Sequence, residues 1–231
     1  MTEHIVSAFD SELNELQAMI AEMGGIAEKM QAEAIDALSR QDSRLAQSII
    51  LQDQRLDALQ REVEEKAILT IARRQPMAVD LRDVIATIRI ANDLERVGDL
   101  VKNMAKRVLA MEGNLPPQKL LAGIHNMSLM ALGQFKAVID AYSQRDAQAA
   151  LAVWQRDGDI DNLYNSVFRE LLTYMMEDPR NIGFCAHLLF GAKNVERIGD
   201  HATNIAETVY YLVTGQSLAV DRPKGESLGA P

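Results

Sequence analysis

The chain has 231 residues, a formal net charge of −9 at pH 7 and one cysteine, Cys185, so an intramolecular disulfide is excluded. Its 48% hydrophobic and 25% charged residues are typical of a folded soluble protein, and no segment approaches the roughly 18 consecutive apolar residues of a membrane-spanning helix. The negative charge opposes binding to nucleic-acid phosphates, no dense Lys/Arg tract offsets it, and cations are the favoured partners.

Apolar residues recur with a helical period along nearly the whole chain, and prolines fall at the ends of the periodic segments. Methionine and alanine are plentiful whereas aromatic residues are few, which favours the packing of helices over that of sheets. We expect Gly24-Gly25 to weaken the first helix. The sequence predicts six helices, over residues 11–38, 43–74, 79–111, 118–142, 146–176 and 182–213.

A break near the middle of the chain, Gly-Asn-Leu-Pro-Pro at 113–117, divides these helices into two groups of three. Long helices with short connections are typical of antiparallel neighbours in a bundle. We therefore predict an all-α fold of two tandem three-helix bundles, over 1–112 and 118–214. The polar, Gly- and Pro-containing residues 215–231 are predicted to form a disordered tail.

A duplicated segment indicates that the two bundles arose by internal duplication. Residues 91–103 and 192–204 align without a gap, and a repeat with a period of about a hundred residues indicates two copies of one structural unit. Among the positions identical in the two copies, Glu95, Arg96, Gly98, Asp99 and Asn103 match Glu196, Arg197, Gly199, Asp200 and Asn204.

Pairs of carboxylates with i, i+4 spacing occur twice in each repeat, so the two members of a pair lie about one helical turn apart. Like charges at this spacing repel, whereas a hard cation between them would be coordinated by their oxygens. Because the helices that carry the pairs are joined by tight turns, each repeat can hold four carboxylates between adjacent helices. The candidate metal ligands are Asp53, Asp57, Glu95 and Asp99 in the first repeat, and Asp157, Asp161, Glu196 and Asp200 in the second.

The identity of the metal stays open among Fe, Mn, Mg and Zn, as divalent or trivalent ions. Asn103 and Asn204 are secondary candidate ligands. The acidic stripes of the third and sixth helices lie roughly opposite their apolar faces, so we expect exposed sites from which a metal exchanges readily. The alternative is a solvated acidic face without any metal.

Several single residues near these motifs have ordinary structural interpretations. Gly98 and Gly199 interrupt helix interiors, and we favour a close approach of two helices over room for a ligand. For Arg96 and Arg197 we favour ion pairs over binding of an anion, and we expect His201 to be a surface histidine. Cys185 lies in an apolar run, which favours a buried structural thiol.

Together these motifs resemble the PhoU family over about residues 5–213. The resemblance depends on both copies of Glu-Arg-Val/Ile-Gly-Asp, on the upstream Asp-x-x-x-Asp pairs, and on Pro76 followed by Asp80-Leu-Arg82. The second repeat departs from the pattern, because Gly183 stands near the position that Asp80 occupies in the first. The resemblance implies two three-helix bundles with metal clusters at the eight carboxylates named above.

The resemblance also implies a regulatory function: negative regulation of the phosphate regulon. The chain would be a metal-binding adaptor between the ATPase subunit of a phosphate ABC transporter and a membrane sensor histidine kinase. We expect a cytoplasmic homodimer that reaches the inner face of the membrane only through protein partners, that binds no nucleic acid and that is not an enzyme. The N-terminus also lacks the pattern of a signal peptide.

Two other classes of protein remain as alternatives. One is a carboxylate-bridged dimetal helical-bundle enzyme or ferritin-like metal-handling protein, which builds its site from Glu-x-x-His motifs that this sequence lacks. The other is a helical interaction module without metal. Metal analysis of the purified protein separates this module from the metal-binding classes.

Overall fold

The computed structural model describes residues 2–111 and 117–218, and within these ranges every regular element is helical, as predicted. The predicted break at 113–117, apart from Pro117, and most of the predicted tail lie outside the described residues. The elements are α1 (Thr2–Arg40), α2 (Ser43–Arg74), α3 (Val79–Ala110), α4 (Gln118–Gln144), α5 (Ala147–Trp154), α6 (Asp157–Glu177), a short 3₁₀ turn (Pro179–Asn181) and α7 (Ile182–Thr214).

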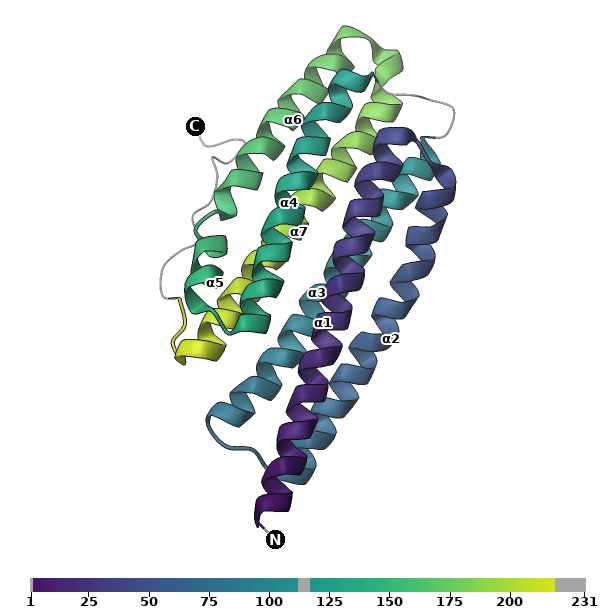
Figure 1. Ribbon diagram of the computed structural model, residues 1–231. Coiled ribbons are helices and arrows are strands. Elements are labelled where there is room, and N and C mark those ends of the chain that lie inside the picture. The colour runs from purple at the N-terminus through teal and green to yellow at the C-terminus, as the bar shows by residue number, and fades with distance from the viewer. Residues whose placement is uncertain (1, 112–116, 219–231) are drawn as a thin grey trace.

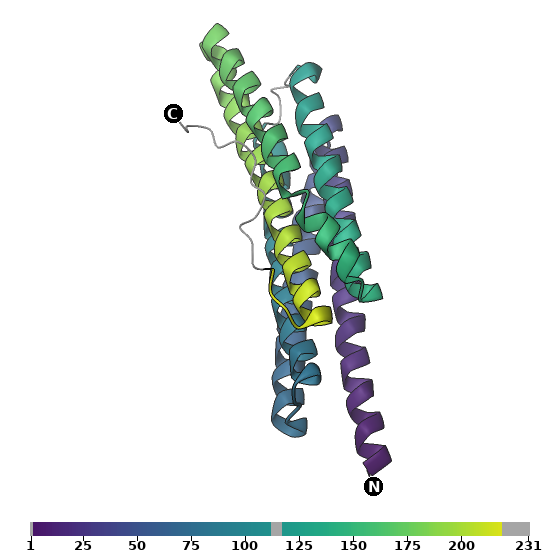
Figure 2. The ribbon, with the colours of Figure 1, turned by 90° about the vertical axis from the view of Figure 1, so that its left-hand side faces the viewer.

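The helices form two bundles, in each of which consecutive long helices run antiparallel, and the bundles lie side by side along a common long axis (Figure 1). α1, α2 and α3 pack together in the first bundle, and α4, α6 and α7 in the second, with α5 beside α7. The bundles meet where α1 packs on α4 and α3 packs on α7, which gives an elongated molecule (Figure 2). Buried apolar side chains from both repeats form one continuous core.

The turns that open the second helix of each repeat are built alike. Asp42 accepts hydrogen bonds from the backbone N–H groups of Arg44 and Leu45, and Asp146 does the same for Gln148 and Ala149. Such a side chain satisfies backbone donors that the first turn of a helix leaves without partners. The residue before each of the two aspartates has a φ of +52°, so the duplication extends to the loops.

The predicted fifth helix, 146–176, is wrong in one respect, because the structure divides it into α5 and α6 at Gln155 and Arg156. At this division the carbonyl of Arg156 accepts hydrogen bonds from the backbone N–H of Asp159 (3.1 Å) and from the side chain of Gln134 on α4 (3.0 Å). Asp157 thereby becomes the first residue of α6, where the positive end of the helix dipole favours a carboxylate.

The first helix also differs from the prediction, since α1 begins at Thr2 and continues through Gly24-Gly25. Gly24 faces α4, and a Cβ atom there would lie 3.0 Å from Cγ2 of Ile139. The glycine therefore serves the close approach of two helices from different repeats, and the packing offsets its low helix propensity.

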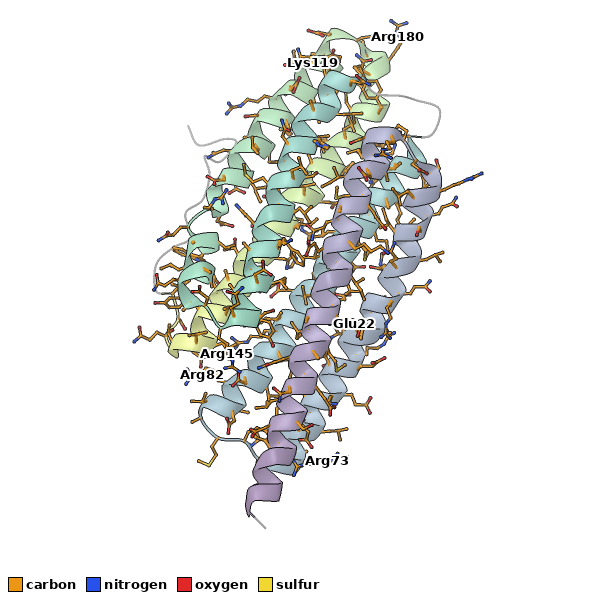
Figure 3. All side chains as sticks on the ribbon, in the orientation of Figure 1. Glu22, Arg73, Arg82, Lys119, Arg145 and Arg180 are labelled. Carbon is orange, nitrogen blue, oxygen red and sulfur yellow. The ribbon has the colours of Figure 1, made fainter. Side chains whose placement is uncertain are left out.

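Polar contacts near the end of α4 add to the joint between the repeats. Arg145, labelled beside α3 in Figure 3, places Nη2 2.8 Å from Oδ1 of Asp83. The guanidinium of Arg82 on α3 lies over the ring of Tyr211 on α7, 5.4 Å from its centroid. Contacts of this kind fix the register of two helices whose apolar faces alone could slide.

Gly98 and Gly199 mark equivalent close approaches within each repeat, which confirms the packing interpretation. A Cβ atom on Gly98 would lie 2.4 Å from Cδ2 of Leu56, and one on Gly199 would lie 2.7 Å from Cδ1 of Ile160. Leu56 is on α2 and Ile160 is on α6. The glycines therefore let the helices with the repeated motif, α3 and α7, approach the helices that carry the other carboxylate pairs, α2 and α6.

Alanine at Gly98 or Gly199 is expected to lower the free energy of unfolding, because overpacking costs about 1–3 kcal/mol and exceeds the roughly 1 kcal/mol gained in helix propensity. Gly25→Ala is the matched control, since no atom lies within 4 Å of the added Cβ atom and α1 is helical there. The control should be neutral or stabilising. Urea denaturation followed by circular dichroism measures all three, and equal midpoints for Gly25→Ala and Gly98→Ala would contradict the packing argument.

Candidate metal centres

The first cluster consists of Asp53, Asp57, Glu95 and Asp99, and the fold does bring these four carboxylates together across α2 and α3. Asp53 is buried, with 2% of its surface exposed, whereas the side chain of Asp99 is 33% exposed. Lys102 lies between them: its Nζ donates hydrogen bonds to Oδ2 of Asp53 and to Oδ1 of Asp99, each at 2.5 Å. One ammonium group thus joins the two helices through their carboxylates.

Two carboxylates of the first cluster, Asp53 and Glu95, have raised pKa values. Burial raises the pKa of Asp53, the hydrogen bond from Lys102 lowers it, and the charges of Asp57 and Asp99 raise it further. Burial also raises the pKa of Glu95, as do the other three carboxylates, against the opposing effect of Arg96. The net effect is a concentration of negative charge that favours a bound cation.

The charge of Lys102 is held by the same contacts. Partial burial lowers its pKa, but the hydrogen bonds to Asp53 and Asp99 outweigh burial and raise the pKa above its usual value. Arg96 adds a more exposed cation, with Nε 3.4 Å from Glu95 and Nη1 3.4 Å from Asp99, which confirms the expected ion pair for Arg96, while that for Arg197 stays a prediction.

The second cluster consists of Asp157, Asp161, Glu196 and Asp200, which line one open hollow of about 600 Å³ together with Arg197, His201 and Asn204. Thr203 donates a hydrogen bond to Oδ1 of Asp157 at 2.7 Å. Lys193 donates to Oε1 of Glu196 at 2.6 Å, while the buried Oε2 of Glu196 has no hydrogen-bond partner in the structure. Burial raises the pKa of Glu196, and the charges of Asp200 and Asp161 raise it further, against the effect of Lys193.

The expectation of exposed sites is wrong for one aspartate of each cluster. Asp53 and Asp157 are 2% and 6% exposed, because they lie on the faces of α2 and α6 that turn toward the motif helices. The side chain of Glu196 is 13% exposed. The two-helix arrangement therefore buries one aspartate of each candidate ligand set and leaves the other three carboxylates partly exposed.

His201 is a contact between the repeats, so the surface assignment is also wrong. Its Nδ1 lies 2.8 Å from Oδ1 of Asp93 on α3, and the amide of Asn204 donates to the same oxygen at 3.2 Å. The sequence analysis missed Asp93, because a single sequence gives no indication that two residues 108 positions apart are in contact. Cys185 is fully buried as expected, and burial raises the pKa of its thiol.

The donor sets of the two clusters differ in their fit to a metal ion. Across residues 2–111 and 117–218, no three His, Cys, Asp or Glu side chains converge as a ready-made site. In the first cluster an ammonium group stands between the carboxylates that a metal would bridge. In the second, carboxylates from α6 and α7 line one hollow, and the free lone pairs of Glu196 Oε2 suit a hard cation such as Mg²⁺, Mn²⁺ or iron.

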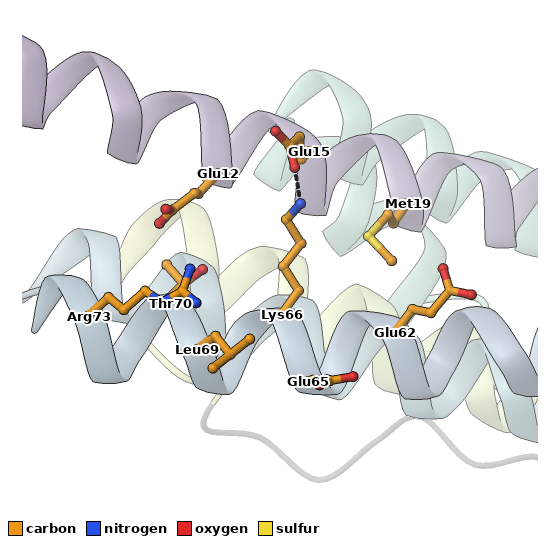
Figure 4. A pocket seen from close by; sticks show the side chains of 9 residues that line it. All are labelled: Glu12, Glu15, Met19, Glu62, Glu65, Lys66, Leu69, Thr70 and Arg73. Carbon is orange, nitrogen blue, oxygen red and sulfur yellow. Dashed lines mark hydrogen bonds and ion pairs between the residues drawn. The ribbon is translucent and has the colours of Figure 1, made fainter.

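A further hollow lies between α1 and α2 and is lined by charges of both signs (Figure 4). Lys66 on α2 pairs with Glu15 on α1 across it. At its edge Arg74 donates from Nε and Nη2 to the two carboxylate oxygens of Glu12, at 3.1 and 2.8 Å. These pairs join the two helices, so we interpret this hollow as structural.

The pair of Glu12 and Arg74 should make stability depend on pH. The hydrogen bond from Arg74 lowers the pKa of Glu12, so the folded state favours the ionised carboxylate. The stabilisation is then present above the usual glutamate pKa of about 4.3 and is lost as the pH falls through the lowered value. Arg74→Met should lower the urea midpoint at pH 7 and match the wild type near pH 3, and a constant difference at both pH values would exclude this cause.

Within the ranges that the structure describes, no helix combines the length and the apolar character required to cross a membrane. A family model described as the PhoU domain matches residues 20–108 and 124–209, one copy in each repeat. The boundaries of these matches agree with the internal duplication seen in the helices, the turns and the acidic motifs.

Curated relatives match nearly the full length. The phosphate-specific transport system accessory protein PhoU homolog of Rhizobium meliloti is 56% identical and covers 96% of this chain and 94% of its own length. The protein of the same description from Caulobacter vibrioides is 51% identical, with 97% of each chain covered. Among solved structures, PhoU from Pseudomonas aeruginosa has a TM-score of 0.85 at 38% identity and covers 90% of this chain and 100% of its own.

The phosphate transport system regulatory protein PhoU from Streptococcus pneumoniae is similar too, with a TM-score of 0.84 at 29% identity. This match covers 92% of the present chain and 100% of the other. Both comparisons extend over the two bundles, including the helices that carry the acidic motifs.

Proposed function

Because this chain belongs to the PhoU family, we propose that it regulates phosphate uptake and phosphate-starvation signalling without being an enzyme. The observation that carries the proposal is the similarity, over more than nine-tenths of both chains, to curated accessory proteins of phosphate-specific transport. In this proposal the chain binds the ATPase subunit of a phosphate ABC transporter and a membrane sensor histidine kinase, and it biases the kinase toward its phosphatase state when phosphate is sufficient.

Exposed apolar side chains support binding to protein partners. Several of them lie in the sequence at or near the turn between α2 and α3 and others near the turn between α6 and α7, and Figure 1 shows these two turns at opposite ends of the molecule. Exposed apolar groups of this kind mark interaction surfaces more often than single scattered ones do. They are Ile68, Leu69, Met77, Val79 and Leu81 at the first end, and Leu172, Met176 and Ile182 at the second.

The metal in this proposal has an organising role. A cation at the second cluster would cross-link α6 and α7 through carboxylates of both helices and neutralise their repulsion. The surface near the α6–α7 turn would then have one defined shape for a partner. Asp157, Asp161, Glu196 and Asp200 are the residues that would hold it.

A pull-down of the tagged chain from phosphate-replete cells tests the proposal directly. We expect to recover the transporter ATPase subunit and the sensor kinase, with a lower yield in the presence of a chelator. Met77→Glu and Met176→Glu place a charge at the two apolar ends, where the side chains are 80% and 78% exposed, so the fold should be retained. Recovery of neither partner by the wild-type chain would contradict the adaptor function. The expected homodimer and cytoplasmic location are separate predictions, for light scattering and cell fractionation.

A further inference from the structure

The two acidic clusters differ at one position that the duplication makes equivalent. The gapless alignment that pairs Asn103 with Asn204 also pairs Lys102 with Thr203. Both side chains bind the buried aspartate of the neighbouring helix: Lys102 binds Asp53 and Thr203 binds Asp157. The first repeat therefore has a charged donor where the second has a neutral one.

The ammonium of Lys102 has the position that a bridging cation would take. It lies 2.5 Å from an oxygen of Asp53 on α2 and 2.5 Å from an oxygen of Asp99 on α3, so it contacts one carboxylate from each helix. Its side chain is only 20% exposed and that of Asp53 is 4% exposed. Because the group is tethered to α3, its effective concentration at these oxygens is far above that of a free ion.

We propose that Lys102 is the built-in cation of the first cluster, so that this repeat is held together without metal and a divalent ion binds only to the second cluster. The inference depends on the proposed function for the metal-binding part of the second repeat and adds that the two repeats are unequal. A metal that enters the first cluster must displace an ammonium group from two carboxylates at once.

In the second cluster a neutral hydroxyl, that of Thr203, takes the place of the Lys102 ammonium at the buried aspartate. Lys193 has a 47% exposed side chain, pairs with Glu196 on its own helix and lies over the ring of Tyr164, 5.2 Å from its centroid. Arg197 lines the hollow, as does His201, which also bonds to Asp93. Thr203 donates a hydrogen bond to Asp157 but carries no charge. Unlike Lys102 in the first cluster, it does not offset the negative charge of the aspartate that it binds.

Exchanging the two equivalent residues tests the proposal. Purified full-length wild type, Lys102→Thr and Thr203→Lys are equilibrated with Mn²⁺, and bound metal per chain is measured by elemental analysis. Lys102→Thr should gain a second class of bound Mn²⁺, which Asp57→Asn in the same chain removes. Thr203→Lys should lose most of the metal that the wild type binds. Lys102→Arg is the control that keeps the charge, and it should bind as much Mn²⁺ as the wild type.

The outcomes separate this inference from the proposed metal function. Equal metal content in wild type and Lys102→Thr overturns the inference. A single Asp57→Asn substitution that lowers the metal content of the otherwise wild-type chain overturns it too. A wild type without metal, together with a Lys102→Thr variant that binds it, supports Lys102 as the built-in cation of the first cluster and overturns metal binding at the second cluster. If Lys102→Thr does not fold in chelator, the loss of Mn²⁺ by Thr203→Lys still decides, because a wild-type level in that variant overturns the inference.

Discussion

Replacing Lys102 by methionine is expected to lower the free energy of unfolding by roughly 3–5 kcal/mol in the presence of chelator, as for a buried ion pair that loses one partner. The apolar stem of the side chain is kept, so the loss reports the charge. Asp53 would be left buried at 2% exposure with no ammonium beside it, and its Oδ1 already lacks a hydrogen-bond partner in the structure. Urea denaturation followed by circular dichroism measures the change.

Two further variants identify the cause of that loss. Asp53→Asn combined with Lys102→Met removes the buried charge, so the double variant should regain much of the stability. Lys193→Met removes a lysine that is 47% exposed and pairs with Glu196, so it should cost less than about 1 kcal/mol. A loss below about 1 kcal/mol for Lys102→Met would show that Asp53 does not depend on this ammonium.

The double variant Asp161→Asn, Asp200→Asn is expected to bind Mn²⁺ about 100-fold or more weakly than the wild type. Even residues outside the first coordination shell contribute 10- to 100-fold to metal affinity. Both residues line the hollow of the second cluster, and the substitution keeps their size while removing two negative charges. Isothermal titration with Mn²⁺ measures the affinity directly.

The matched control carries the same substitutions in the other repeat. Asp57→Asn with Asp99→Asn removes two charges from the first cluster, where Lys102 is the resident cation, so the Mn²⁺ affinity of the chain should stay close to that of the wild type. An affinity that falls equally in the two double variants would show that the clusters bind metal alike. No change in either would place any bound metal elsewhere.

The fold could be predicted from the sequence because it depends on local signals. The helical period of apolar residues and the positions of prolines defined the helices, and the repeated Glu-Arg-Val/Ile-Gly-Asp segment defined the two bundles. The division at Gln155 and Arg156 escaped prediction, and the contact made there, a hydrogen bond from Gln134 on another helix, has no signal in the local sequence. The length of α1 escaped because close packing on Ile139 offsets the cost of Gly24.

The proximity of four carboxylates in each repeat was predictable, whereas their burial and their partners were not. The i, i+4 spacing and the tight turns between helices were enough to group four carboxylates in each repeat. The burial of Asp53 depends on which face of α2 meets α3, and the position of Lys102 depends on a side-chain path between two helices. Neither feature follows from the spacing of residues in the sequence. The difference between Lys102 and Thr203 could be interpreted only once the structure showed that each binds the buried aspartate of its own repeat.

Expression of phosphate-starvation genes in phosphate-rich medium is the measurement that tests the central claim most directly. Deletion of the gene for this chain should derepress a reporter of those genes, and the wild-type gene supplied in trans should restore repression. The Asp161→Asn, Asp200→Asn variant should restore it less well if metal organises the partner surface. Normal repression in the deletion strain would contradict the assignment of this chain as a negative regulator of phosphate signalling.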